Sequence, residues 1–343
     1  MMAIVRIDMD AVKLAARKLE AGKLVAFPTE TVYGLGGDAE NAAAIADIYA
    51  AKGRPANHPV IVHVAPEADI SYWAAEVPAE ARALIEAFWP GPLTLILKRA
   101  AHVPAAASGG QDSIGVRCPS HPVAQALLRE FKGGKGGIAG PSANKFGHVS
   151  PTTAEHVRDE FGSDDDSLVD YILDGGPSEV GIESTIVDLS RASTHGAVLL
   201  RPGQISVDQI AAVLGKAPSA PDVAAPRASG TLDAHYAPHT PVAQVSAEQL
   251  AGTVKELVGR QYKVAVIYRT VEIISTHASI AMAQEADQYA HDLYAALRDM
   301  DHRHADVILV EATPSTPAWQ GINDRLRRAA FDSTGILSRL LAT

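Results

Sequence analysis

The feature that most constrains the fold is a glycine-rich stretch at residues 28–37, which follows a short apolar run ending at Phe27. The stretch reads Pro28-Thr29-Glu30-Thr31-Val32-Tyr33-Gly34-Leu35-Gly36-Gly37, and a helical pattern starts near Asn41. The glycines allow backbone conformations and close approaches that side chains would prevent. We therefore predict a strand, a loop over 28–37 and a helix. The loop matches neither common phosphate-loop spacing, so a ligand-binding loop and a tight structural turn both remain open.

The composition describes an ordinary globular chain. With 343 residues, of which 47% are hydrophobic and 20% charged, it is long enough for about two domains. No apolar run is long enough to span a bilayer and no signal-peptide core is present, so we expect a cytoplasmic protein without membrane contact. A net charge of −10 argues against a broad nucleic-acid surface. Cys118, the single cysteine, has no disulfide partner, and we expect a small buried hydrophobe in a strand.

Hydrophobic periodicity divides the first part of the chain into alternating helices and strands. We expect helices over 11–21, 41–51, 78–89, 122–131 and 206–214, and a further helix capped by Thr152 or Thr153. We expect strands over 24–27, 59–64, 93–97, 113–118, 138–139, 168–173, 184–189 and 197–200. This alternation predicts an α/β domain over residues 1–214.

A linker separates this domain from a second one. Residues 215–230 contain Pro218, Pro221 and Pro226 without a hydrophobic period, so we expect a semi-extended linker over 215–240. Beyond it, helical and strand patterns alternate over 247–257, 264–268, 286–301, 305–311 and 322–330. We therefore predict a smaller, Rossmann-like α/β domain over 241–343, with a partly parallel sheet.

Further motifs follow the glycine-rich stretch in order. They are Lys52-Gly53-Arg54-Pro55, Pro141-Ser142-Ala143-Asn144, Glu183-Ser184-Thr185 and Leu200-Arg201-Pro202-Gly203. Together they resemble the YrdC-like family of threonylcarbamoyl-adenylate synthases, and His235-Tyr236-Ala237-Pro238 extends the resemblance to the longer two-domain members. The resemblance implies a twisted-sheet domain with a concave site. It also implies a reaction in which L-threonine, bicarbonate or CO₂, and ATP with Mg²⁺ become threonylcarbamoyl-adenylate and pyrophosphate.

Four residues are the main candidates for positioning the reactants. Lys52 and Arg54 lie two apart across a glycine, and a guanidinium fork beside an ammonium suits a triphosphate if both face one cavity. A bare pair of this kind is more often a solvated helix end. Ser142 and Asn144 follow a strand, where open α/β sheets bind ligands, although such residues also stabilise turns.

The resemblance implies further contacts with both substrates. Its nucleotide contacts are His58, where similar proteins commonly have asparagine, Ser113, Ser150 and Arg201, together with His235 and Tyr236 in the segment expected to fold over the site. Its threonine contacts are Thr31, Tyr33, His63, Arg117, Gly140 and Ser184. Arg117 can form a bidentate pair with the α-carboxylate. Alternatively, His63 and Arg117 are solvent-facing strand positions and Tyr33 fills the core.

Other interpretations remain at this point. Asp164-Asp165-Asp166 lacks the spacing of a calcium loop, and we expect a solvated loop instead. The same concave site could serve an RNA-binding or ribosome-associated protein, or a carbamoyl-adenylate enzyme with another acceptor. If the chain is the synthase, the family implies that a separate transferase complex moves the product to the adenosine beside the anticodon of certain tRNAs.

Overall fold

The structure, a computed structural model, describes residues 7–162, 168–271, 273 and 276–342. The chain forms two compact units, each with its own sheet. The first comprises Met1–Phe146, Pro151–Glu179 and Glu183–Thr231, and the second comprises Gly147–Ser150, Val180–Ile182 and Leu232–Thr343. Two short pieces from within the first unit's stretch of sequence thus belong to the second. Among the described residues, no helix combines the length and apolar character needed to cross a bilayer.

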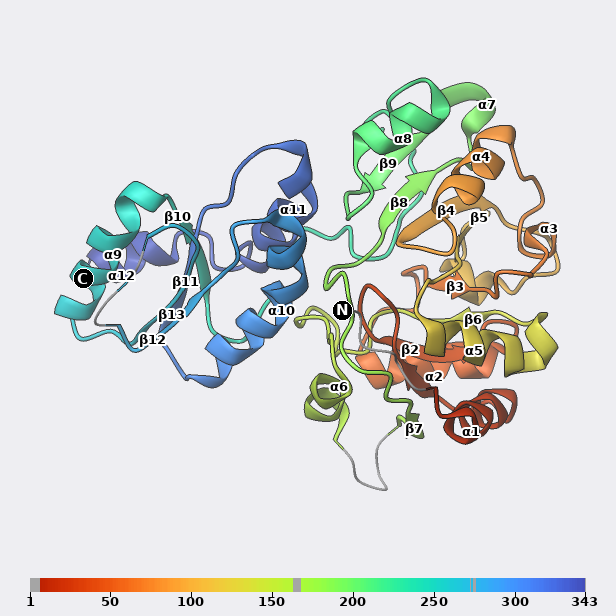
Figure 1. Cartoon of the computed structure of the whole chain (residues 1–343), viewed down its shortest axis with the longest axis horizontal. Helices are drawn as coiled ribbons and strands as arrows, with labels where there is room; N and C mark the ends of the chain where they lie inside the picture. Colours follow the sequence, from red (N-terminus) through yellow and green to blue (C-terminus); the bar gives the residue numbers. More distant parts are fainter. Residues whose placement is uncertain (1–6, 163–167, 272, 274–275, 343) are drawn as a thin grey trace. The chain divides into compact units, whose positions relative to one another are not determined.

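A mixed sheet forms the centre of the first unit (Figure 1). Its strands are β1 (Val25–Phe27), β2 (Gly34–Asp38), β3 (Ile61–His63), β4 (Leu93–Lys98), β5 (Ser113–Arg117), β6 (Ile138–Ala139), β7 (Tyr171–Ile172), β8 (Thr185–Asp188) and β9 (Val198–Arg201), in the order β7-β1-β2-β6-β3-β5-β4-β8-β9. The helices are α1 (Met9–Glu20), α2 (Ala42–Lys52), α3 (Ile70–Trp73), α4 (Ala79–Phe88), α5 (Pro122–Glu130), α6 (Ala154–Phe161), α7 (Ala192–His195) and α8 (Val207–Leu214), with 3₁₀ turns η1 (Ala105–Ser108) and η2 (Phe131–Gly134). The α/β prediction is confirmed.

The prediction of a loop over 28–37 is wrong at its second half, because Gly34 to Asp38 form strand β2, antiparallel to β1. The glycines are required by packing within the sheet. A Cβ atom on Gly36 would lie 2.9 Å from Ile138 Cγ2 and 2.9 Å from the Val25 carbonyl oxygen. Close approach between strands therefore explains a glycine pattern that is also typical of loops.

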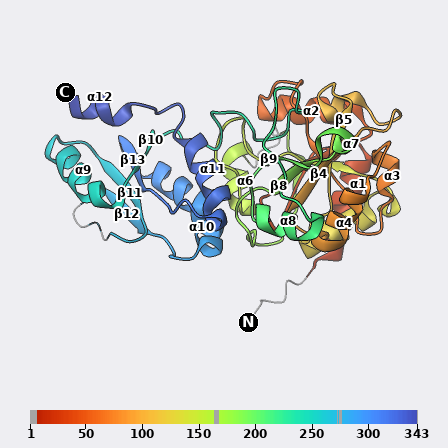
Figure 2. The same cartoon turned by 90° about the horizontal axis from the view of Figure 1, so that it is seen from above.

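The second unit is a smaller α/β domain, as predicted. Its strands β10 (Val242–Val245), β11 (Val264–Tyr268), β12 (Ala278–Ala281) and β13 (Val307–Glu311) pair in the order β10-β13-β11-β12, and every pairing is parallel. In both views these strands lie between α9 (Ala247–Gly259) and α10 (Ala286–His302) (Figures 1 and 2). A 3₁₀ turn, η3 (Pro317–Trp319), and helices α11 (Gln320–Ala329) and α12 (Ile336–Ala342) complete the unit. Strands β10 and β12 and helix α12 were not expected from the sequence.

Candidate active site

The register of the first sheet brings candidate residues from separate strands onto one face. His63 on β3 pairs directly with Arg117 on parallel strand β5. Strand β4 pairs with β5 so that Thr94 lies one residue beyond the Leu95–Val116 pair, opposite Arg117. Because side chains alternate along a strand, these three residues share a face with Ser113. We call the part of this face over β3, β5, β4, β8 and β9 the site face.

Helices α1 and α5 pack on the neighbouring part of the same face. They contact Val25, Phe27 and Ile138 from β1 and β6. Over the site face, Ile61, Ile96 and Ile186 instead form a small cluster with Ala228. The segment after α8 therefore lies on the site face, on residues of three different strands.

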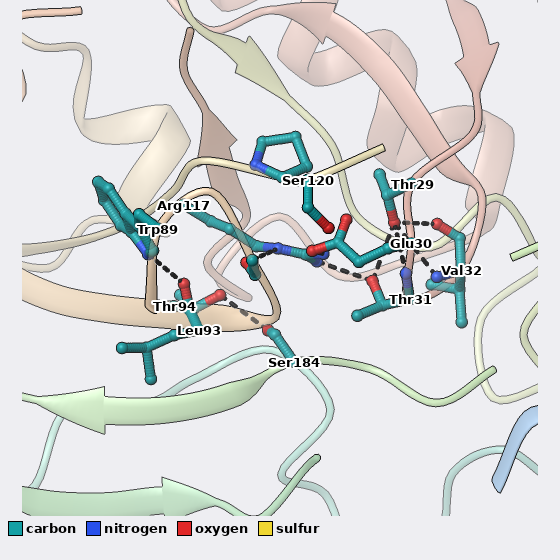
Figure 3. A network of polar contacts seen from close by, with 12 residues as sticks. Thr29, Glu30, Thr31, Val32, Trp89, Leu93, Thr94, Arg117, Ser120 and Ser184 are labelled. Carbon is teal, nitrogen blue, oxygen red and sulfur yellow. Dashed lines mark hydrogen bonds and ion pairs between the residues drawn. The ribbon is translucent and has the colours of Figure 1, made fainter. Parts of the chain in front are cut away.

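Arg117 is the centre of a buried polar group at the end of β5 (Figure 3). Its Nη1 donates to Thr31 Oγ1 at 2.8 Å and its Nε donates to the Gly91 carbonyl at 3.3 Å. Its Nη2 lies 2.6 Å from Glu30 Oε1, in an ion pair whose side chains are 4% and 2% exposed. The solvent-facing alternative for Arg117 is wrong. Part of the guanidinium predicted for a substrate carboxylate is already in contact with a protein carboxylate.

Sequence reasoning missed Glu30. The signal that could have found it is Arg117 itself, an arginine in a strand whose residues are all buried. Buried arginine needs a counter-ion. Glu30 is presented by a turn that Thr29 stabilises, because Thr29 Oγ1 accepts the Thr31 and Val32 N–H groups at 3.2 Å each and donates to the Val32 carbonyl at 2.6 Å (Figure 3).

His63 is buried beside this group and is neutral. Burial, and secondly the nearby Arg117 guanidinium, lower the pKa of its imidazole from 6.5 to about 3. Its ring makes an edge contact with Phe27, with the centroids 5.5 Å apart. A Cβ atom on Gly140 would lie 3.0 Å from both His63 Nδ1 and Phe27 Cζ. Gly140 therefore contributes to the site by leaving room for the histidine.

Ser184 joins the same region from the start of β8. Its hydroxyl lies 2.8 Å from Thr94 Oγ1, a contact within the view of Figure 3. Arg201 donates to the Ser184 carbonyl from Nε at 3.1 Å and from Nη2 at 3.0 Å. The four predicted threonine contacts Thr31, His63, Arg117 and Ser184 thus gather at one edge of the sheet. Thr94 joins them without having been expected.

Lys52 and Arg54 lie close together, and each donates to carbonyl groups of the chain. The buried Lys52 ammonium donates to the carbonyls of Ser142 and Asn144. Burial, and secondly Arg54, hold the pKa of Lys52 well below its usual value. After Gly53, which ends α2 in the left-handed conformation at φ 62°, Arg54 turns to the Pro59 carbonyl at 2.8 Å. Lys52 is therefore packed against the Ser142–Asn144 turn, close enough to Arg54 for the two charges to interact. That both cations face one cavity stays a prediction.

Ser229 connects two predicted nucleotide contacts. Its carbonyl accepts from Arg201 Nη1 at 2.8 Å, and its hydroxyl lies 3.4 Å from Arg54 Nη2. Because Ala228 packs on the site face, these contacts hold residues 228–229 across it. Ser229 was not among the candidates that the sequence predicted.

The remaining first-unit candidates lie apart from these groups or in the core. Tyr33 is fully buried and donates to the Gly176 carbonyl at 2.7 Å, so it fills the core. The half-buried His58 contacts the Phe146 ring, and Ser113 is buried at the start of β5. Cys118 is a buried free thiol, as expected, although it follows directly after β5 instead of lying in it, and burial raises its pKa to about 12. Asp164, Asp165 and Asp166 lie outside the described residues.

Three predicted nucleotide contacts belong to the second unit. These are Ser150, His235 and Tyr236. Tyr236 is buried, with φ 61°, and its ring lies 4.2 Å from the His235 ring and 5.5 Å from the Arg325 guanidinium. Within that unit the two aromatic residues pack in the interior. Their contact with a nucleotide stays a prediction.

Two protein families match the chain in succession. Residues 17–203 match the Sua5/YciO/YrdC family, described as "Telomere recombination". Residues 205–331 match the family described as "Threonylcarbamoyl-AMP synthase, C-terminal domain". Because the first match alone spans more than half of the chain, the family relationship does not depend on the resemblance of short motifs.

The similarity to individual proteins extends over nearly the whole length of the chain. The chain is 37% identical over 340 residues to threonylcarbamoyl-AMP synthase of Pyrococcus abyssi, covering 95% of each chain. It is 38% identical over 328 residues to the Bacillus subtilis protein of the same name, covering 92% of each. Among solved structures, P. abyssi Sua5 complexed with L-threonine aligns with a TM-score of 0.85 and 35% identity over 95% of both chains. A variant of that protein, with a neighbouring histidine and tyrosine replaced by alanine, gives a TM-score of 0.86 at 34% identity, over 95% of this chain and 94% of that one.

Proposed function

Since this chain belongs to the Sua5/YciO/YrdC family, in its two-domain threonylcarbamoyl-AMP synthase form, we propose that it joins L-threonine, bicarbonate or CO₂, and ATP. The products are L-threonylcarbamoyl-AMP and diphosphate. The chain is an enzyme of the nucleotidyltransferase kind, because AMP is transferred onto the threonine-derived carbamate.

One observation carries the proposal. Thr31, His63, Arg117 and Ser184 come from distant parts of the sequence and gather at one edge of the sheet. The fold in which they do so is shared with a protein solved in complex with L-threonine. We propose that this edge binds threonine, with Arg117 facing its carboxylate.

The nucleotide is assigned to the region around Lys52 and Arg54. The reaction needs no covalent enzyme intermediate, because the threonine amine adds to the one-carbon unit and the resulting carbamate oxygen attacks the α-phosphate. The protein must then position three reactants and stabilise phosphate charge. The buried Lys52 ammonium, beside the Ser142–Asn144 turn, and the buried Arg54 guanidinium supply such charge. We propose that Arg201 and Ser113 contact the nucleotide from the site face. We further propose that His58 contacts it from the border of that face.

Magnesium and the later steps belong to the same proposal. Mg²⁺ enters as the ATP complex, held chiefly by phosphate oxygens and water. The product is unstable in water and is passed to a separate transferase complex that modifies the adenosine beside the anticodon of tRNA. A cytoplasmic place of action goes with that role.

The test is pyrophosphate release by the full chain with Mg-ATP, L-threonine and bicarbonate. Reactions that omit each substrate in turn, and one with serine in place of threonine, define the requirement. We expect release only when all three are present. Release without threonine, or none from folded protein that binds ATP, would overturn the proposal.

Arg54→Ala tests the nucleotide assignment. We expect turnover to fall at least about 100-fold, in line with the loss of one group that stabilises developing charge. Arg82→Ala removes an exposed arginine from α4 and is the matched control. Wild-type turnover in Arg54→Ala would contradict the assignment.

A further inference from the structure

The strongest unassigned feature is a concentration of buried polar atoms without aligned hydrogen bonds at the end of β5. Within the described part of the chain, they include both carboxylate oxygens of Glu30, Nη2 of Arg117 and Nδ1 of His63. Each of these side chains is at most 4% exposed. Buried polar groups in folded proteins are normally hydrogen-bonded, and such a cluster indicates a site completed by a ligand.

The contacts within the cluster leave some hydrogen-bond donors and acceptors of Glu30 and Arg117 unused. Glu30 Oε1 has the Arg117 charge beside it at 2.6 Å, although the two groups are not aligned as a hydrogen bond. Within the described residues, Glu30 Oε2 has no hydrogen-bond partner. A guanidinium carries five N–H donors, and the contacts of Arg117 with Gly91, Thr31 and Glu30 account for three of them. One carboxylate oxygen of Glu30 and two N–H donors of Arg117 therefore remain for a ligand.

This arrangement is the electrostatic complement of a zwitterion. An α-amino acid carries a carboxylate and an ammonium group on the same carbon, so both can meet an adjacent arginine and glutamate at once. A buried ion pair that lacks further hydrogen bonds is costly, and a ligand of the opposite polarity satisfies both halves. The alternative acceptors are weaker, since His63 is neutral and Thr31 Oγ1 already accepts from Arg117.

We propose that the Glu30 carboxylate binds the α-ammonium group of the amino-acid substrate while Arg117 binds its carboxylate. The site then selects the zwitterionic form of the substrate through a fixed pair of opposite charges. This inference rests on the proposed function, because it assigns a further residue to the same threonine site. It adds Glu30, which lies within the glycine-rich motif but was not among the predicted contacts.

A cycle that compares two ligands on the wild type and one variant tests directly whether Glu30 binds the ammonium group. The ligands are L-threonine and (R)-3-hydroxybutyrate, which keeps the carboxylate and hydroxyl groups but lacks the amine. Their affinities for the wild-type chain and for Glu30→Gln are measured by calorimetry without ATP. A hydrogen bond to a charged group corresponds to roughly 10- to 100-fold in affinity. We expect the wild type to prefer threonine by this factor, and Glu30→Gln to show at most about a threefold preference.

The cycle separates ammonium binding from an indirect role. If Glu30 only positions Arg117, Glu30→Gln weakens both ligands equally and the preference for threonine persists, which would overturn the proposal. Wild-type protein that binds no threonine would instead contradict the proposed function. Should Glu30→Gln fail to fold, Glu30→Asp keeps the charge but withdraws it by one methylene. A preference unchanged in Glu30→Asp would also overturn the proposal.

Asp188 provides the matched control. It is another buried carboxylate of the same sheet, 3.6 Å from Arg191 and bonded to the Ser190 N–H at 2.8 Å, at the opposite end of β8 from Ser184. Asp188→Asn removes a buried charge without touching the Arg117 group. We expect its preference for threonine to equal that of the wild type.

Discussion

Two buried cations of the first unit have opposite kinds of partner. The Arg117 guanidinium lies against a carboxylate, that of Glu30. The Lys52 ammonium lies against two carbonyl oxygens, from Ser142 and Asn144, which carry no net charge. Both side chains are at most 4% exposed, so water screens neither of them.

The difference indicates which ligand each region can take. A cation that is already neutralised gains little from a second anion, and it suits a ligand that brings both charges. The Lys52 ammonium donates to neutral carbonyl groups, and the Glu160 and Glu183 carboxylates act on its pKa less than burial and Arg54 do, so its charge is less completely balanced. Burial and Arg54 lower the Lys52 pKa, and an incoming phosphate would reverse that effect by favouring the charged form. We therefore associate Arg117 and Glu30 with the zwitterionic threonine, and the region around Lys52 with the polyanionic ATP.

The largest expected effect comes from breaking the neutral pair. Arg117→Gln leaves the Glu30 carboxylate buried without a counter-ion, and we expect the free energy of unfolding to fall by about 3–5 kcal/mol. Adding Glu30→Gln removes the unpaired charge, so the double variant should recover most of this stability while remaining unable to bind threonine. Urea unfolding and calorimetry measure the two properties. A double variant no more stable than Arg117→Gln would show that the two side chains are not a coupled pair.

A smaller loss of stability is expected from replacing Lys52, the cation that donates to neutral carbonyl groups. Lys52→Met leaves two buried carbonyl groups without their donor but creates no unpaired charge, and we expect it to cost about 1–3 kcal/mol. The functional effect should be specific: KM for Mg-ATP rises, whereas the affinity for threonine without ATP does not change. An equal loss of affinity for both substrates would contradict the division into two regions. Lys98→Met, which removes an exposed lysine from the end of β4, is the control.

Much of this arrangement could be predicted from short-range signals. Asn41 accepts from the N–H groups of Ala43 and Ala44, and α2 starts where the sequence predicted it. Strand β2 was missed, because glycines that a strand needs for close packing have the composition of a loop. Strand β12 was also missed, because it is short and no strong turn signal flanks it. Its residues alternate between half-buried and exposed, so it contains no apolar run.

The site residues show a similar division. Motifs identified the cations and hydroxyls, but nothing local in Thr29-Glu30-Thr31 reveals that the glutamate is buried. That fact depends on a contact with Arg117, and on a register that brings β3, β4 and β5 together. Ser229 was missed for the same reason, because its contacts with Arg54 and Arg201 join parts of the chain far apart in sequence.

The smallest expected effect concerns His63, the third ionisable side chain beside the Glu30–Arg117 pair. It tests whether this histidine stays neutral and so leaves the pair without a net charge. The folded-state pKa of His63 is about 3, below the ordinary 6.5, so the unfolded chain takes up this proton first on acidification. The stability due to neutral His63 is fully present above pH 6.5 and is lost as pH falls toward 3, by up to about 1.4 kcal/mol per pH unit.

His58 and His121 also have lowered pKa values, so the informative quantity is the difference between two proteins. Between pH 7.5 and 5.5, we expect the wild type to lose about 1.4 kcal/mol more stability in urea unfolding than His63→Asn does. The exposed-residue control, His302→Asn, should follow the wild type. If His63→Asn and the wild type had parallel pH profiles, His63 would take up its proton in the folded chain. The Arg117 group would then carry a net positive charge below neutral pH, and it would resemble the Lys52 region instead of differing from it.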